Sequence, residues 1–354
     1  MDSERDIIAV SLPLAAGVAL AAAAGMPELS ALISSCLLPF AFLLCLLKPG
    51  RTALPVALLC FIAGAFCYSS SAIPARVTAS SPDFASDALS RLLALTDSIE
   101  FGHEGTGAMV KALLTGRREG LDRATVAAFR SSGASHILAL SGLHLGVIYA
   151  ILSRALAVLG NSRPGMAARS TAIIVLCGFY ALMTGCGPSI VRAFLFISLN
   201  EMYRLHSGRK RSAVSIFCVA LTLQLVFNPQ VITSVGFQLS YLAMAGIFFI
   251  FPRLDALYPA SSSLDPMRRI WSSAMISLSC QLTTAPVAWY HFHTFPKYFL
   301  LTNLLALPLS SLIMTSAVTT VCLTALGICP EALVRLTDAL VSSLEFCLRT
   351  IASM

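Results

Sequence analysis

The sequence predicts an all-α fold: a polytopic transmembrane helical bundle of about ten spans. Of its 354 residues, 57% are hydrophobic and only 12% are charged, whereas a soluble domain carries about 25% charged residues. The mean hydropathy is +0.81, and apolar runs recur that match the roughly 20 residues a helix needs to cross a bilayer. A soluble fold would leave much of this apolar surface in water, so the composition excludes one.

Helix-breaking and charged residues divide the apolar runs into the expected spans. The last run contains Pro308, so one kinked span and two shorter pieces both remain open. The expected spans are residues 7–24, 30–47, 53–72, 134–159, 170–186, 188–204, 213–228, 233–251, 270–290 and 299–326.

Lysine and arginine gather in alternate loops between these spans, while the loops near residues 25–29, 185–187 and 228–231 carry almost none. The positive-inside rule places the basic loops in the cytoplasm, together with the N-terminus. The formal charge of +7 is therefore largely a sign of topology. The basic groups are Lys48 and Arg51; Arg154, Arg163 and Arg169; Arg204, Arg209, Lys210 and Arg211; and Arg253, Arg268 and Arg269.

Four parts follow in chain order: N-terminal transmembrane helices (1–72), an extracytoplasmic amphipathic segment (73–133), a membrane core (134–330) and a C-terminal amphipathic helix (331–354). Helical spacing of apolar residues predicts a surface helix in the second part, and short helices are expected near 104–115 and 121–130. The stripe in the last part likewise predicts an interfacial helix. The two stripes are Ala88, Leu92, Leu95 and Ile99, and Leu333, Leu336, Leu340, Leu344 and Ile351.

The eleven cysteines indicate neither a metal site nor a disulfide framework. No CxxC pair or Cys/His ligand spacing occurs, and most cysteines lie inside apolar runs, where cysteine behaves as a small hydrophobe. We therefore expect no metal and no cofactor.

The segment SHILALSGLHLG, residues 135–146, opens the fourth expected span. His136 and His144 are eight residues apart and would share one helix face, which Ser141 can join. Gly142 and Gly146 are four apart, a spacing that lets a neighbouring helix approach closely. Helix packing and a functional polar face both remain open for this segment.

A second polar segment, TGCGPSIVRAF, covers residues 184–194. Gly185 and Gly187 break the preceding helix, and Pro188 suits the first position of a new one, followed by Ser189. Arg192 then lies one turn inside the helix. A helix N-terminus with an arginine can bind an anion; alternatively, the arginine extends to the lipid headgroups.

Other polar residues within the expected spans are Gln238, Ser240, Gln281 and Asn303. They either line a conduit or connect helices by hydrogen bonds. Between residues 124 and 330, the only acids are Glu201, Asp255 and Asp265, at cytoplasmic ends or loops. Because proton and sodium carriers usually need a carboxylate in the membrane, this interior suits a polyanion or a neutral solute. HExxH, GxSxG and Walker A patterns are absent.

Six segments together resemble the ComEC-type competence family of DNA-uptake proteins, in the family's order and over roughly residues 104–326. The resemblance implies a channel that passes single-stranded DNA through the bacterial inner membrane, with a path near His136, Ser141, His144 and Arg192. The segments are KALLTGRREGL (111–121), SHILALSGLHLG, TGCGPSIVRA, GFQLSYLAMAG (236–246), QLTTAP (281–286) and NLLALPL (303–309).

Two family features are missing from the sequence: an extracytoplasmic OB-fold, which residues 73–103 are too few to form, and a metallo-β-lactamase-like nuclease domain. We therefore expect no enzymatic activity. The expected partners are single-stranded DNA, the lipid bilayer, a cytoplasmic ATP-driven motor, and separate extracytoplasmic DNA-binding or nuclease proteins. Three alternatives remain: an intramembrane hydrolase using Ser141 and His144, a transporter of a small anionic or lipid-like solute, and a degenerate family member with only a structural role.

Overall fold

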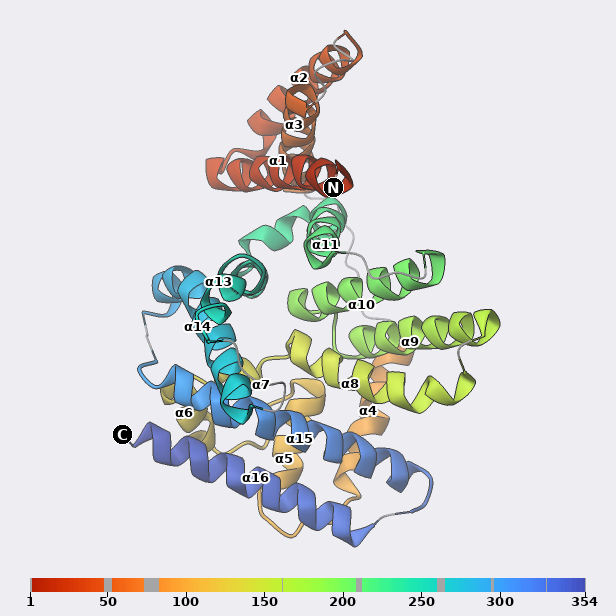
Figure 1. Ribbon diagram of the computed structural model, residues 1–354, viewed down its shortest axis with the longest axis vertical. Helices are drawn as coiled ribbons and strands as arrows, with labels where there is room; N and C mark the ends of the chain where they lie inside the picture. The colour runs from red at the N-terminus through yellow and green to blue at the C-terminus, as the bar shows by residue number, and fades with distance from the viewer. Residues whose placement is uncertain are drawn as a thin grey trace. The chain divides into compact units, whose positions relative to one another are not determined.

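The computed structural model describes residues 2–47, 53–72, 83–160, 162–207, 212–259, 265–293, 296–328 and 330–353, and within these ranges it contains helices and no strands (Figure 1). This confirms the predicted helical class. The chain forms two compact units. Unit 1 comprises Met1–Ser80 and Leu195–Gln238, and unit 2 comprises Ser81–Phe194 and Leu239–Met354.

Five described helices are long and apolar enough to cross a membrane, as expected for a membrane protein. Three further apolar helices are shorter, at Pro27–Leu38, Val56–Ser71 and Ala213–Phe227. A count of about ten spans therefore stays a prediction. The five longer helices are Glu4–Ala24, Gly142–Leu159, Arg163–Met183, Val235–Asp255 and Phe299–Ala325.

In unit 1, the first helix crosses the third at two glycines. A Cβ at Gly17 would overlap the Phe61 carbonyl, and one at Gly64 would overlap the Leu14 carbonyl. Only glycine permits this approach of two helix backbones. The helices wholly in this unit are α1 (Asp2–Ala24), α2 (Pro27–Leu47), α3 (Ala53–Ala72), α11 (Ala213–Phe227) and the 3₁₀ helix η2 (Pro229–Thr233).

Unit 2 holds the regions with the strongest polar motifs. Two helices pass from one unit into the other: α10 (Pro188–Ser207) and α12 (Val235–Ala245). The remaining elements are α4 (Asp83–Asp97), α5 (Thr106–Thr115), α6 (Arg123–Ser131), α7 (Ser135–Leu138), α8 (Gly142–Ala155), η1 (Leu156–Leu159), α9 (Arg163–Met183), the π-helical η3 (Gly246–Ile250), α13 (Phe251–Asp255), α14 (Pro266–Phe292), α15 (Phe299–Ala325) and α16 (Glu331–Ala352).

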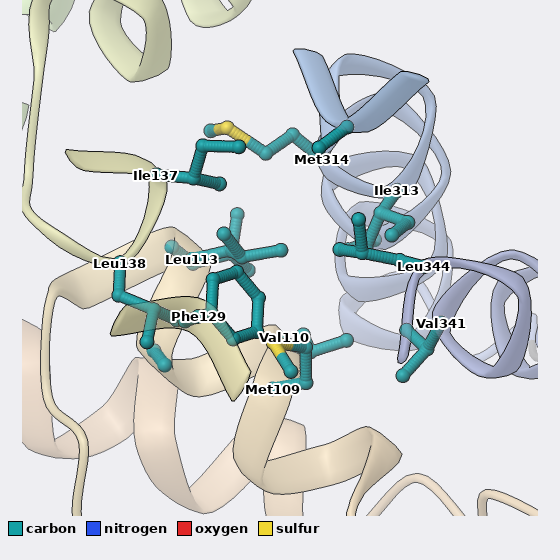
Figure 2. Packing of buried hydrophobic residues seen from close by; sticks show 14 of the residues in the cluster. Met109, Val110, Leu113, Phe129, Ile137, Leu138, Ile313, Met314, Val341 and Leu344 are labelled. Carbon is teal, nitrogen blue, oxygen red and sulfur yellow. The ribbon is translucent and has the colours of Figure 1, made fainter. Parts of the chain in front are cut away.

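The core of unit 2 brings the short helices α5, α6 and α7 against α15 and α16. Figure 2 shows Leu113 and Phe129 beside Ile137, with Met314 and Leu344 facing them from the long helices. All five side chains are at most 1% exposed. Burying such side chains contributes about 1.5–3 kcal/mol each, so this core holds the loop-rich region before α8 in place.

The expected apolar stripes of α4 and α16 lie partly on this core. Leu92 and Leu95 of α4 pack against it, and Leu344 of α16 is buried in it. Leu336, which belongs to the same predicted stripe, is 50% exposed. The buried face of α16 runs instead through Val334, Thr337, Val341, Leu344, Leu348 and Ile351, where it lies alongside α15 (Figure 1).

The last apolar run forms one continuous helix, α15, which contains Pro308. This settles the choice between one span and two short pieces. Part of the predicted cytoplasmic charge (Lys48, Arg51 and residues 209–211) and residues 73–82 of the expected extracytoplasmic segment lie outside the described residues.

Candidate anion-binding site

The SHILALSGLHLG segment is broken by a helix start, not continuous through the fourth expected span. Residues Ser135–Leu138 form the separate short helix α7, Ala139 and Ser141 are extended, and α8 begins at Gly142. His136 and His144 therefore lie on different helices, and the prediction that they share one helix face is wrong. The physical reason is that Ser141 caps α8, which requires an extended backbone at this position.

Ser141 and His144 satisfy the first turn of α8 reciprocally. The Ser141 hydroxyl oxygen accepts from the Leu143 N–H (3.2 Å) and lies 2.9 Å from His144 Nδ1, while the Ser141 N–H donates to the same Nδ1 (3.2 Å). This is a capping box in which histidine replaces the usual Glu or Gln. Since Nδ1 accepts the backbone proton, the neutral imidazole carries its own proton on Nε2. His144 is 1% exposed; its Nε2 makes no hydrogen bond of good geometry, and the Ile137 backbone of α7 lies beside the ring.

The start of α10 follows a tight reversal after α9. Gly185 has φ 84° and Cys186 has φ 51°, and the Cys186 N–H donates to the Ala181 carbonyl (2.9 Å). Helix α10 then begins at Pro188, as predicted from the proline. Ser189 donates to the Ser240 hydroxyl of α12 (3.2 Å), so the first turn of α10 is tied to a third helix.

Arg192 is buried among these helices, with 8% of its surface exposed. Its guanidinium carbon lies 5.7 Å from the centre of the Tyr241 ring on α12, within the range of a cation–π contact. A Cβ at Gly142 would lie 3.4 Å from Arg192 Nη2 and 3.5 Å from the Ala193 Cβ. The guanidinium is therefore enclosed by the start of α8 and by α12.

The positive charge of Arg192 has no neutralising partner among the described residues. No Asp or Glu oxygen of those residues lies within 4.0 Å of the guanidinium, and its buried Nη1 has no hydrogen-bond partner. An unpaired buried charge is costly, because the low-dielectric surroundings replace water without compensating it. An anion bound at Nη1 would supply the missing partner.

We call the group formed by Ser141, Gly142, His144, Ser189, Arg192, Ser240 and Tyr241 the Arg192 site. Its charged member is a cation, its buried Nε2–H is a neutral donor, and two helix N-termini contribute positive dipole ends. The first turns of α8 and α10 favour negative charge for the same reason that helix starts bind phosphate. This arrangement of groups is chemically suited to binding an anion.

The other predicted residues are not among the described residues that enclose Arg192. His136 is exposed, and its Nδ1 lies 3.1 Å from the Gly133 carbonyl; Gln238 donates to the Ile232 carbonyl (2.9 Å). Asn303 has a buried Oδ1 without a partner. Their place in a transport path, like that of Gln281, stays a prediction. A Cβ at Gly146 would meet nothing within 4 Å, in contrast to Gly142.

Sequence reasoning missed Tyr241, the residue whose ring covers Arg192. It directly follows Ser240 in GFQLSYLAMAG, but apolar helices contain many aromatic residues and the pairing with Arg192 is a long-range contact. Within the described ranges, His, Cys, Asp and Glu side chains do not gather in groups of three or more that could hold a metal ion.

These features define a helical membrane protein in which a buried cation at the junction of three helix segments has no acidic partner among the described residues. The family model described as Competence protein matches residues 113–354. The chain belongs to the Competence protein family.

Curated relatives match over a similar region. ComE operon protein 3 of Bacillus subtilis is 31% identical over 205 residues, which cover 58% of this chain and 25% of that protein. Competence protein ComA of Neisseria gonorrhoeae is 28% identical over 217 residues, 60% of this chain and 30% of that protein. The chain thus spans a quarter to a third of the length of these relatives. No solved structure matches it.

Proposed function

We propose that this chain forms an inner-membrane conduit for the import of single-stranded DNA during natural transformation. The observation that carries the proposal is the buried guanidinium of Arg192, which has no carboxylate partner among the described residues and an unsatisfied Nη1. Membership of the Competence protein family and the names of two relatives support DNA as the polyanion.

In this mechanism, phosphate groups of the strand pass the Arg192 site one after another. Nη1 of Arg192 donates to a phosphate oxygen, and the starts of α8 and α10 add favourable dipoles. His144 holds the first turn of α8 in the capping box with Ser141. The Tyr241 ring holds the guanidinium while leaving Nη1 without a protein partner. Each contact is weak enough to release the strand, because conduction requires release as well as binding.

The same proposal places the protein in the bacterial inner membrane with its N-terminus in the cytoplasm. The basic loops support this orientation through the positive-inside rule. Movement of the strand requires energy, and the sequence contains no Walker A pattern. The proposed partners are a cytoplasmic ATP-driven motor and separate extracytoplasmic DNA-binding or nuclease proteins.

Substitution of Arg192 tests the proposal. We expect Arg192→Met, which removes the charge and keeps an apolar stem, to lower uptake of labelled single-stranded DNA into cells by about 10-fold or more. A charge-assisted hydrogen bond contributes about 1.5–3 kcal/mol, which corresponds to that range. Arg192→Lys retains the charge and restores part of the uptake. Arg154→Gln is the matched control, since Arg154 is an exposed arginine at the other end of α8.

Protein levels in the membrane fraction are measured for every variant, so a folding defect is separated from a transport defect. Normal uptake by Arg192→Met at normal protein level would show that the site does not act on the strand. A small anion or lipid-like solute that competes with DNA for transport into vesicles would favour the transporter alternative instead.

A second candidate function, intramembrane hydrolysis, has one specific observation in its favour. The Ser141 hydroxyl lies 2.9 Å from His144 Nδ1, within reach of a nucleophile–base pair. The same contact belongs to the capping of α8, because Nδ1 also accepts the Ser141 N–H and the hydroxyl accepts the Leu143 N–H. The geometry thus fits both roles.

Replacement of Ser141 separates these two roles. Asparagine caps helices about as well as serine, whereas alanine costs about 1 kcal/mol of stability. If Ser141 acts as a cap, Ser141→Asn supports uptake and Ser141→Ala lowers the amount of folded protein. If Ser141 is a nucleophile, both variants lose activity equally and a serine-directed probe labels only the wild-type chain.

A further inference from the structure

Unit 2 contains a cavity of about 570 Å³ whose walls come from four separate parts of the chain. They are helix α4, residues 115–118 after α5, residues 138–140 before α8, and residues 182–185 at the end of α9. Helices α4 and α9 lie side by side here (Figure 1). Three of the wall segments belong to motifs that carry the family resemblance, and none of the predicted site residues except Gly185 lines the cavity.

Two adjacent arginines, Arg117 and Arg118, line this cavity, and both are exposed. Arg117 lies 3.8 Å from a Glu119 oxygen, and its side chain remains 49% exposed. No salt bridge within the described residues involves Arg118, and no Asp or Glu is among the lining residues. Thr115 and Thr184 also line the cavity, and their hydroxyls donate to the Lys111 carbonyl (2.7 Å) and the Tyr180 carbonyl (2.8 Å) of their own helices. The polar part of the cavity is therefore cationic.

The apolar part of the cavity wall consists of aliphatic side chains, among them Leu89, Leu140 and Leu182. A ligand that fits both parts carries an anionic group and an apolar or aromatic body. The volume lies within the roughly 300–1,000 Å³ of small-molecule pockets, on the order of one or two nucleotides. A nucleotide of single-stranded DNA combines a phosphate with a base whose faces are apolar, and such strands bind where cationic grooves adjoin apolar stacking surfaces.

The chain connects this cavity directly to the Arg192 site. Leu140, in the wall, precedes Gly142 by two residues, and Gly185 precedes Pro188 by three. Successive Cα atoms are about 3.8 Å apart, so the wall lies within roughly 11 Å of the start of both α8 and α10. A strand whose phosphate occupies the cavity is therefore near the first turns of both helices.

We propose that this cavity, which we call the arginine cavity, is a binding site for one or two nucleotides of single-stranded DNA and delivers the strand to the Arg192 site. Arg117 and Arg118 contact the phosphates, and the aliphatic wall holds a base. The inference rests on the proposed function, and it assigns a role to two arginines outside the helices that carry the Arg192 site.

Binding of a fluorescent oligothymidylate to the full chain in zwitterionic nanodiscs tests the inference. Each phosphate contact on a single strand contributes about 0.7 to the slope of log K against log salt. The double variant Arg117→Gln, Arg118→Gln should lower the steepness of that slope by about 1.4. Between 1 M and 0.1 M salt, its affinity should therefore rise about 25-fold less than the affinity of the wild-type chain. Arg123→Gln, an exposed arginine of α6 that does not line the cavity, should leave both quantities unchanged.

A second variant fills the cavity without removing charge. Ala139 is an exposed wall residue with extended backbone, and Ala139→Trp should weaken oligonucleotide binding at every salt concentration. Ala124→Trp, on the exposed side of α6, is the matched control. Circular dichroism verifies that each variant keeps its helical content.

An unchanged salt slope in the double arginine variant overturns the inference, as does unchanged binding by Ala139→Trp. If the double variant instead loses co-purified anionic phospholipid while oligonucleotide binding stays the same, the cavity is a lipid site. Failure of the proposed function gives a different result: wild-type vesicles then bind the oligonucleotide with the expected slope but do not take it up even with an ATP-driven motor.

Discussion

Gly116, the residue that ends α5, is the position where a single methyl group should distort the arginine cavity. Its backbone has φ 76° and ψ −1°, and a Cβ there would lie 2.6 Å from Leu140 Cγ and 2.7 Å from Leu140 Cδ1. Gly105 lies just before the other end of the same helix, with φ 92°, and a Cβ there would meet nothing within 4 Å. The two glycines form a matched pair for alanine substitution.

The expected costs follow from these geometries. A left-handed backbone costs an L-residue about 1–2 kcal/mol, and a lower entropy of the unfolded chain returns about 0.4–1 kcal/mol. Gly105→Ala should therefore destabilise the chain by about 1 kcal/mol. Gly116→Ala adds a steric overlap that Leu140 must relieve by moving, and overpacking of this kind costs about 1–3 kcal/mol. Its total cost should be about 2–4 kcal/mol.

Reversible unfolding in mixed micelles, followed by circular dichroism, measures both free energies of unfolding. Leu140→Ala removes the atoms with which the new methyl group overlaps, so Gly116→Ala and Leu140→Ala should cost less together than the sum of their separate effects. Equal losses for Gly105→Ala and Gly116→Ala, or strictly additive effects of Gly116→Ala and Leu140→Ala, would refute the claim that Leu140 closes on the Gly116 backbone.

Two further substitutions test contacts within unit 2. Tyr180→Phe removes the hydroxyl that donates to the Leu114 carbonyl at 2.7 Å. That carbonyl lies in the last turn of α5 and has no helical donor. We therefore expect the free energy of unfolding to fall by about 1–3 kcal/mol. Gly246→Ala would bring a Cβ to 2.5 Å from the Ser279 carbonyl oxygen and 2.8 Å from Thr283 Oγ1. The substitution should separate η3 from α14 and so speed proteolysis between α13 and α14. Unchanged proteolysis would count against this packing.

The sequence predicted the start of α10 and the break before it. Gly185 and Pro188 act locally, through a reversed backbone and a fixed φ, so their effect needs no other part of the chain. The same reasoning failed at α8, although its signal is also local. Ser141 followed three residues later by His144 resembles a capping box, but histidine is not the usual partner, and an apolar run on both sides suggested one uninterrupted helix.

The burial of Arg192 was left open by the sequence, which allowed both an internal anion site and a headgroup contact. The choice depends on what surrounds the guanidinium, and those atoms come from Gly142 and Tyr241, about fifty residues away along the chain on either side. Arg117 and Arg118 lie in the segment KALLTGRREGL, whose local pattern gives no sign of a cavity. Its walls meet only when four distant segments pack together.

By itself, the sequence determined that this chain is helical and suited to a membrane, because a bilayer leaves backbone groups no partners except those within the helix. It also located most helices, since apolar runs and breakers act over a few residues. Only the tertiary structure decided which polar groups meet: the cap that starts α8, the enclosure of Arg192 by Tyr241, and the cavity at Arg117 and Arg118. Those arrangements depend on close packing between segments far apart in the chain, which local residue patterns do not encode.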